Sequence, residues 1–371
     1  MRKFKTLIST FFSLYLLTAS VSFGYEGKND QVNTTNVAGY APNYGFYVQS
    51  PDQRFRLVTA GYIQNTFQTL FVENGPDTDS FQVLRARLKW FGYIFNPNIA
   101  YQFGYDLVGT QLLDAYIQFS ATEFFKVRSG QYKVPFNLEG LSSASTLQFT
   151  DRSIAHTFFG VVGERDIGLG FNGHFGEKLL EYHVSIFNGE GANTLNSNKE
   201  LLYAGRLTLN LLGEHGLEFA DPARSEKPHM ALGVAGMFND TPNVTLGGEK
   251  QVLSSTFDLS AKFKGFSAHA AYFYRKTDPD SGGSLMDHGA LGQAGYFILP
   301  HDLEVALRTA HIFAESASDQ AEYTIDITYY ILGDHRVKFQ FGHSALITQD
   351  GVSPGDDQIN FRTRFQLQVA L

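Results

Sequence analysis

The chain has 371 residues, a formal net charge of −8 and no cysteine. The missing cysteines exclude disulfides, thiolate metal sites and cysteine nucleophiles, and the acidic balance argues against a nucleic-acid partner. Aromatic residues make up 15% of the chain, a bias that favours strands and membrane interfaces.

The first residues have the pattern of a secretory signal peptide. Three cations open the chain, Arg2, Lys3 and Lys5, and the apolar core Leu7–Leu17 follows. A membrane anchor is the alternative, but a spanning helix needs about 18 or more apolar residues. We therefore expect residues 1–24 to be a signal peptide. The small residues Ser22 and Gly24 form a plausible cleavage site before Tyr25. Residues 25–52 are rich in Asn and Gly, and we expect an irregular lead-in there.

From residue 53 onward, segments of about ten residues alternate apolar and polar side chains, as strands of transmembrane barrels do. Sixteen such segments are centred near residues 61, 87, 103, 117, 128, 170, 183, 207, 234, 259, 270, 294, 307, 327, 341 and 365. Short and long connections largely alternate, with two exceptions: residues 212–228 are long where a short turn is due, and residues 108–110 are short where a loop is due.

This pattern predicts an all-β fold, a transmembrane antiparallel β-barrel of about 16 strands over residues 53–371. A soluble sandwich would also alternate, but it does not need so many strands long enough to cross a bilayer. The expected location is the bacterial outer membrane, with outer-membrane lipid around the barrel.

The stretch FQVLRARLKWFG, residues 81–92, places Arg85, Arg87 and Lys89 at every second position. Residues two apart on a strand share a face, and a cation facing lipid near the midplane costs about 2–4 kcal/mol. The three must therefore face a wet lumen. The same alternation predicts an inward basic set, which we take as pore-lining: Arg85, Arg87, Lys89, Lys126, Arg128, Arg362 and Arg364. Arg206, Arg308 and Lys338 also face inward, as do acids such as Asp106, Asp114, Asp166, Glu181, Asp258, Glu304 and Asp326. Such a field guides anions, and the alternative is a charge network that only props the wall.

Residues 133–164 form the longest interruption, between the fifth and sixth segments. Loops of this length in compact folds are usually functional or disordered, and this one carries much apolar surface. We expect it to fold into the lumen and narrow it, and the alternative is an outer loop packed on a neighbouring subunit. The candidate constriction residues are Lys133, Glu139, Asp151, Arg152, Glu164 and Arg165.

Several motifs resemble the phosphate-selective porin O and P family. They are RARLKWFG at 85–92, GQYKVPF at 130–136, Asp151-Arg152, RDIGLG at 165–170 and SIFNGEG at 185–191. The resemblance implies a sixteen-stranded trimeric channel in which an arginine ladder and a lysine cluster guide phosphate. The ladder positions match at Arg85, Arg87, Lys126 and Arg128, whereas Lys133 is the one lysine of the third loop.

Other motifs lack the context that their chemistry needs. Gly168–Gly173 fits a dinucleotide fingerprint but alternates as a strand, with no helix after it. Gly342-His343-Ser344 begins like a nucleophile elbow, but Leu346 stands where glycine is needed. Asp278–Gly282 resembles a calcium loop without its glutamate, and no histidines have metal spacing. We expect no catalytic residue, no metal, no cofactor and no enzyme activity.

The sequence thus predicts an outer-membrane porin for passive diffusion of small hydrophilic solutes, anions such as phosphate first among them. A homotrimer is implied by the resemblance. A general or cation-permissive porin is one alternative, and a plugged structural or adhesive barrel is another.

Overall fold

The structure is a computed structural model that describes residues 37–42, 44–161, 164–242, 249–349 and 357–371. Sixteen long strands form the barrel wall. They are β3 (Arg56–Phe71), β4 (Thr78–Ile94), β5 (Asn96–Asp106), β6 (Gln111–Thr122), β7 (Phe125–Lys133), β8 (Arg165–Phe175), β9 (Leu180–Phe187), β10 (Leu202–Asn210), β11 (His229–Pro242), β12 (Glu249–Phe263), β13 (Phe266–Pro279), β14 (Leu285–Leu299), β15 (Leu303–Ala314), β16 (Asp319–Tyr330), β17 (Val337–Gln349) and β18 (Gln358–Ala370).

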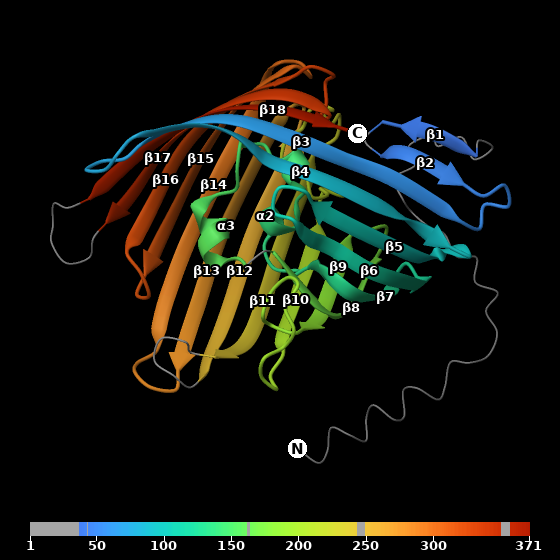
Figure 1. Cartoon of the computed structure of the whole chain (residues 1–371), viewed down its shortest axis with the longest axis horizontal. Coiled ribbons are helices and arrows are strands. Elements are labelled where there is room, and N and C mark those ends of the chain that lie inside the picture. The colour runs from blue at the N-terminus through green and yellow to red at the C-terminus, as the bar shows by residue number, and fades with distance from the viewer. Residues whose placement is uncertain (1–36, 43, 162–163, 243–248, 350–356) are drawn as a thin grey trace.

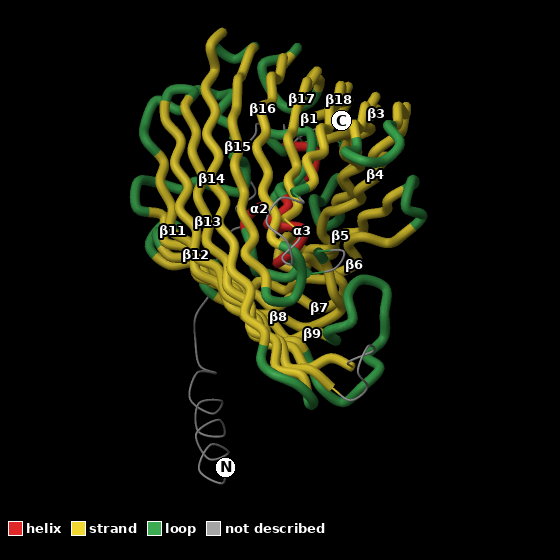
Figure 2. The backbone as a smooth tube through the Cα atoms, turned by 90° about the vertical axis from the view of Figure 1, so that its left-hand side faces the viewer, coloured by secondary structure: helices red, strands yellow, loops and turns green. Residues whose placement is uncertain are grey.

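The sheet closes on itself. Each strand pairs antiparallel with the next, and β18 pairs with β3 from Phe361 opposite Phe71 to Ala370 opposite Tyr62. Closure leaves no open edge along these strands, which is the condition for a sheet in lipid. Figure 1 shows the strands tilted across the wall, and Figure 2 shows it from the side.

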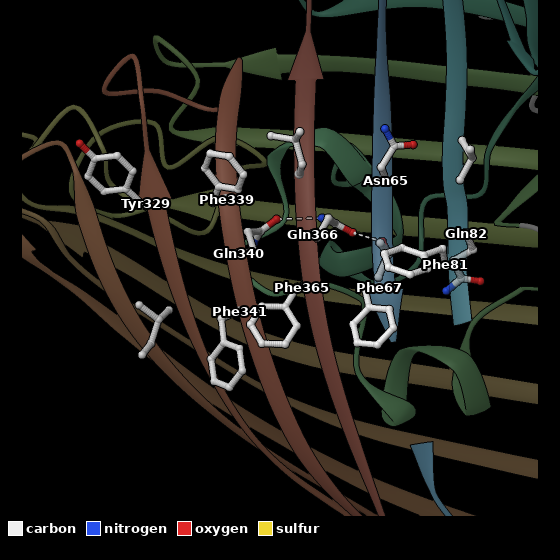
Figure 3. Close-up of a pocket in the computed structure, with 14 residues that line it drawn as sticks. Asn65, Phe67, Phe81, Gln82, Tyr329, Phe339, Gln340, Phe341, Phe365 and Gln366 are labelled. Atoms are coloured by element: carbon white, nitrogen blue, oxygen red, sulfur yellow. Dashed lines mark hydrogen bonds between the residues drawn. The ribbon is translucent and has the colours of Figure 1, made fainter. Parts of the chain in front are cut away.

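The predicted fold class is confirmed. Each of the sixteen predicted centres lies in a different strand, from β3 to β18 in order. Alternation also sorts the faces as expected: on β16, Asp326 is 1% exposed while its neighbours Ile325 and Ile327 are 38% and 37% exposed. Figure 3 shows the same arrangement on the next strands, where the rings of Phe341 and Phe365 alternate with Gln340 and Gln366. The two glutamine side chains share a hydrogen bond of 2.9 Å on the inner side.

A bulge interrupts β4 beside the cationic stretch. Gln64 lies opposite Arg85 and Asn65 opposite Val83, so Leu84 has no partner on β3. The extra residue resets the alternation, because Val83 and Phe81 face outward while Arg85 faces inward two positions later. The expectation that Arg85, Arg87 and Lys89 face inward holds on the far side of this bulge.

The expected irregular lead-in, residues 25–52, needs correction where the structure describes it. β1 (Ala38–Ala41) and β2 (Gly45–Gln49) form a hairpin, and β2 pairs with residues 56–59 of β3. This part of β3 extends past the end of β18, so its hydrogen-bonding edge is open there and the hairpin covers it. The expected signal peptide, residues 1–24, lies outside the described residues.

Short helices occur between β7 and β8: α2 (Leu138–Leu141), the 3-10 helix η1 (Ala144–Thr146) and α3 (Ile154–Phe159). None of the helices in the described residues is long and apolar enough to cross a membrane.

Candidate functional site: the lumen and its third loop

The segment that joins β7 to β8, residues 134–164, is named the third loop here. Side chains cap its helices: Asn137 accepts a hydrogen bond from Gly140 N at the start of α2, and Ser153 accepts one from His156 N at the start of α3. In both Figure 1 and Figure 2 these helices lie within the outline of the strands.

Apolar side chains of the third loop are packed against the inner wall. Phe159 is 1% exposed and stacks on Phe273 of β13, with ring centroids 5.3 Å apart. Gly289 of β14 makes this approach possible, because a Cβ there would lie 2.3 Å from the Phe159 ring. The other buried apolar residues of the loop are Val134, Phe136, Leu138, Ala144, Leu147, Phe149 and Ala155. The apolar character seen in the sequence is therefore accounted for by packing onto the wall.

Polar groups of the wall bind the middle of the loop. Gln148 donates hydrogen bonds to Glu304 at 2.6 Å and to Ser267 at 2.8 Å. Lys338 Nζ donates to the Leu147 carbonyl at 2.7 Å and is fully buried. Gly295 lies under Gln148, since an added Cβ would be 2.2 Å from its Nε2. Glu304 and Lys338 would be hydrated by water in an open lumen. Here their hydrogen-bond partners are groups of the third loop.

Asp151 joins the two arginine-bearing ends of the sheet. Its carboxylate accepts from Arg85 of β4 and from Arg364 of β18, each at 2.8 Å. Burial alone would raise the pKa of the Asp151 carboxyl, but the two guanidinium groups outweigh it and hold that pKa below its usual range. The carboxylate is therefore charged at neutral pH and neutralises part of the predicted ladder.

A second ion-paired site lies on β15 and β16, on the far side of β17 from Arg364. Arg308 of β15 donates to Glu322 at 3.0 Å through Nε and to the Asp151 carbonyl at 2.8 Å. The Ile154 amide, at the start of α3, donates to the other oxygen of Glu322 at 2.8 Å. Each guanidinium nitrogen of Arg308 and each carboxylate oxygen of Glu322 has a hydrogen-bond partner, and such partners are what make a buried ion pair tolerable.

Charged residues also connect the base of the loop. Glu164 lies 2.8 Å from Arg152, 3.7 Å from Lys133 and 3.6 Å from Arg165. Arg165 also pairs with Asp114 of β6 at 3.0 Å. Burial favours the neutral form of Glu164, but His156, Arg152 and Lys133 lower the pKa of its carboxyl below the usual range.

The inner wall is consequently divided in two. Inward side chains of β10–β18 are mostly buried, among them Arg206, Asp258, His269, Phe273, Leu291, Glu304, Arg308, Glu322, Asp326, Lys338, Gln340, Arg364 and Gln368. We call this the covered wall. Inward side chains of β4–β9 that remain half-buried or exposed form the open wall: Arg87, Lys89, Phe91, Gln102, Tyr116, Gln118, Ser120, Lys126, Arg128, Asn172, Glu181 and His183.

Cations of the open wall differ in their partners. Arg87 pairs with Asp106 at 2.8 Å. Lys89 is exposed, and within the described residues no carboxylate lies within 4 Å of its ammonium or of the Arg128 guanidinium. Arg128 is nevertheless fixed in place, because it donates to Gln118 at 2.7 and 3.0 Å and lies 4.4 Å from the Tyr116 ring centre.

The predicted basic residues do not form a ladder of unpaired cations, because several of them are paired with carboxylates. Arg85 and Arg364 converge, as the pairing of the first and last barrel strands implies, but on a carboxylate of the loop. Arg362 is half-buried beside them. The six candidate constriction residues form the anchors just described: four lie in the third loop, and Lys133 and Arg165 flank it as the last residue of β7 and the first of β8. Glu139 is bound to the Ser153 amide and lies 3.8 Å from Arg308. Their role in a constriction stays a prediction.

Some residues of the site were missed or misjudged by sequence reasoning. Arg206, Arg308 and Lys338 do face inward, but they lie under the third loop and do not line open space. Gln148 was missed altogether, since a glutamine in an irregular loop gives no signal. The sequence motif at Gly168–Gly173 is part of strand β8. In the described residues no cluster of three or more metal-ligating side chains occurs.

The family comparison supports the resemblance noted in the sequence. Residues 58–220 match the family model described as phosphate-selective porin O and P. The chain is an outer-membrane porin. The matched stretch runs from β3 into the segment after β10, so it includes the third loop and most of the open wall of this porin. No curated protein sequence matches the chain.

Solved structures of other porins share the fold. An anion-selective porin from Comamonas acidovorans is 13% identical, with a TM-score of 0.61 over 85% of this chain and 99% of that one. The outer-membrane channel DcaP of Acinetobacter baumannii is 12% identical, with a TM-score of 0.62 over 88% and 100%. A trimer form of OmpT, an outer-membrane protein of Vibrio cholerae, is 11% identical, with a TM-score of 0.54 over 85% and 99%. At these identities the likeness establishes the barrel fold alone, and the indication of a channel comes from the family match.

We predict that Asp151→Asn loosens the third loop, because Arg85 and Arg364 lose their shared carboxylate. Removing one member of a buried ion pair costs about 3–5 kcal/mol, less where water reaches the site. The expected result is faster proteolysis of the loop in the folded barrel, together with noisier single-channel current. Asp278→Asn is the control, since it breaks an exposed pair with Lys276 and should change neither readout. Equal behaviour of the two variants would contradict the anchoring role of Asp151.

Proposed function

We propose that this porin passes small inorganic and organic anions by passive diffusion along its open wall. The observation that carries the proposal is that the accessible part of the inner wall bears cations without carboxylate partners. Lys89 and Arg128 lie on the part of the wall that the loop leaves accessible, and no described carboxylate pairs with either. A channel lined on its accessible side by unneutralised cations concentrates anions and repels cations.

The carboxylates of the lumen do not cancel the positive potential of these cations along the open wall. Asp106 and Asp114 are ion-paired with Arg87 and Arg165. Glu181 accepts a hydrogen bond from Asn210 at 2.8 Å and lies toward the end of the barrel that carries the short turns. The family description and the printed name of the Comamonas porin, which is anion-selective, favour the same sign of selectivity over a cation-permissive channel.

A dedicated phosphate site has weaker support than general anion selectivity. Lys133 ends β7 directly before the third loop, and its ammonium donates to the loop carbonyls of Leu141 and Ser142 at 3.2 and 2.6 Å. It also lies near Glu164. Its donors are thus used within the loop, so we propose that phosphate passes as one small anion among several.

The proposal is tested by single-channel recording in a planar bilayer under a KCl gradient. We expect an anion-selective reversal potential, and in Lys89→Gln/Arg128→Gln a shift of that potential toward zero with the conductance retained. The matched control is Lys199→Gln/Lys264→Gln, which removes two exposed cations outside the open wall. A cation-selective wild type would overturn the proposal, and an unchanged double variant would remove these two residues from the mechanism. Absence of current would favour a plugged, structural barrel.

We also propose that residues 1–24 are removed as a signal peptide, so that residues 25–52 precede the barrel of residues 53–371. The charged start and short apolar core support cleavage before Tyr25. N-terminal sequencing of the protein extracted from outer membranes should begin at Tyr25. A first residue before Leu17 would refute this boundary.

The outer face of the barrel favours a homotrimer, which we propose as the assembly in the membrane. A hollow of about 900 Å³ lies across β12–β18, and small residues such as Ala270, Gly292 and Ala294 form part of it. A polar pair also lies at this hollow, midway along its strands, where His343 and Thr363 are 2.9 Å apart. Both features suit a protein neighbour better than lipid chains. The OmpT neighbour is described as a trimer form, which fits this assembly.

If this hollow is the contact between subunits, Ala270→Trp should fill it and convert trimers to monomers in sedimentation experiments. Val234→Trp is the control, because Val234 is half-exposed on the outer face of β11. A trimer that persists in Ala270→Trp would exclude this face, and a monomeric wild type would exclude the trimer itself.

A further inference from the structure

The connection between β10 and β11, residues 211–228, is far longer than is needed to join two adjacent antiparallel strands. It lies at the end of the barrel where the other connections are short, such as the two residues Lys264 and Gly265 between β12 and β13. In outer-membrane barrels this is the periplasmic end. We call residues 211–228 the periplasmic segment. A turn does not need this length, so we looked to the packing of the periplasmic segment for the reason.

The periplasmic segment turns into the barrel. Phe219 and Ala220 are 3% and 1% exposed, as deeply buried as the loop residues on the covered wall. The Phe219 ring meets the ring of His269, an inward residue of β13, at 4.8 Å. Ala220 forms a buried cluster with Phe297 of β14 and Tyr330 of β16. The segment therefore covers inward side chains of three strands at the periplasmic mouth.

Hydrogen bonds tie the segment to the neighbouring short turns. Asp221 accepts from the Gly265 amide at 2.8 Å and from the Ser225 hydroxyl at 2.7 Å. The Pro222 carbonyl lies 2.7 Å from Nδ1 of His301 in the next turn, between β14 and β15. Lys262 of β12 donates to the Glu218 carbonyl at 3.0 Å. With partners in or beside two other turns, the inward position is fixed.

The periplasmic segment also meets the third loop. The Ser142 hydroxyl, at the C-cap of α2, lies within hydrogen-bond distance of both the Leu217 carbonyl at 2.5 Å and the Leu138 carbonyl at 2.8 Å. Ser142 is fully buried. The loop that enters from one end and the segment that enters from the other thus touch on the covered wall.

We propose that the periplasmic segment is a second specificity-determining element, which closes the periplasmic mouth of the covered wall. Solutes are thereby confined to the open wall and its cations over the whole height of the barrel. This inference rests on the proposed conduction of anions. Without the segment, His269, Lys262 and the ion pair of Arg206 with Asp258 would border a second path, away from the open-wall cations that select for anions.

The test replaces residues 214–222 by a flexible Gly-Ser linker of the same length and records single channels under a KCl gradient. We expect a larger conductance and a reversal potential closer to zero than in wild type, because ions gain a path away from the open-wall cations. The control places the same type of linker at residues 280–284, an exposed connection between β13 and β14 on the opposite end. It should conduct like wild type.

A milder variant keeps the test decisive should the replacement fail to fold. Phe219→Ala removes the ring that packs on His269 while leaving the backbone anchors, and it should shift both readouts in the same direction by less. Folding is checked by heat-modifiable migration. A folded linker variant, or a folded Phe219→Ala, with wild-type conductance and selectivity would overturn the role of the segment. A wild type without anion-selective current would overturn the proposed function instead.

Discussion

The whole architecture depends on satisfying backbone hydrogen bonds where no water is available. In a bilayer each unpaired amide or carbonyl costs several kcal/mol, so the sheet must close. Pairing of β18 with β3 achieves this over Tyr62–Phe71. The only part of β3 that extends beyond β18 is covered by the β1–β2 hairpin, as far as the described residues show. Once the wall is closed, its inward side chains can be charged, because they are shielded from lipid.

A closed sixteen-stranded wall leaves more room than small solutes need, and the chain fills it from both ends. The third loop and the periplasmic segment bury most of the inward residues of β10–β18. Filling is possible because the wall offers partners as well as space: Lys338 and Glu322 bind backbone groups of the loop, and Gly289 and Gly295 admit its side chains. The arginine–carboxylate pairs of the covered wall therefore stabilise the loop, and two of them, Arg206 with Asp258 and Arg308 with Glu322, are buried from solvent.

Alternation along each strand was sufficient to predict the barrel, the number of strands and the inward direction of Arg85, Arg87 and Lys89. It could not predict which of them are neutralised. Asp151 meets Arg85 and Arg364 only after the sheet has closed and a loop of irregular structure has crossed the lumen, and neither event has a periodic signature. The same holds for the bulge at Leu84 and for Gln148. The β1–β2 hairpin was missed because its strands are only four and five residues long.

The division of the lumen also orders charge across the passage. Lys89 and Arg128 lie on the open wall with no carboxylate within 4 Å among the described residues, whereas Asp151 and Glu164 of the third loop are paired with arginines. Cations without a carboxylate partner on one side of the passage produce an electric field perpendicular to the barrel axis, in addition to any field along it. A solute with separated charges gains energy by aligning its dipole with this field, and water in the passage is oriented in the same way. Dipolar solutes would therefore cross in one preferred orientation, whereas nonpolar solutes of the same size would have none.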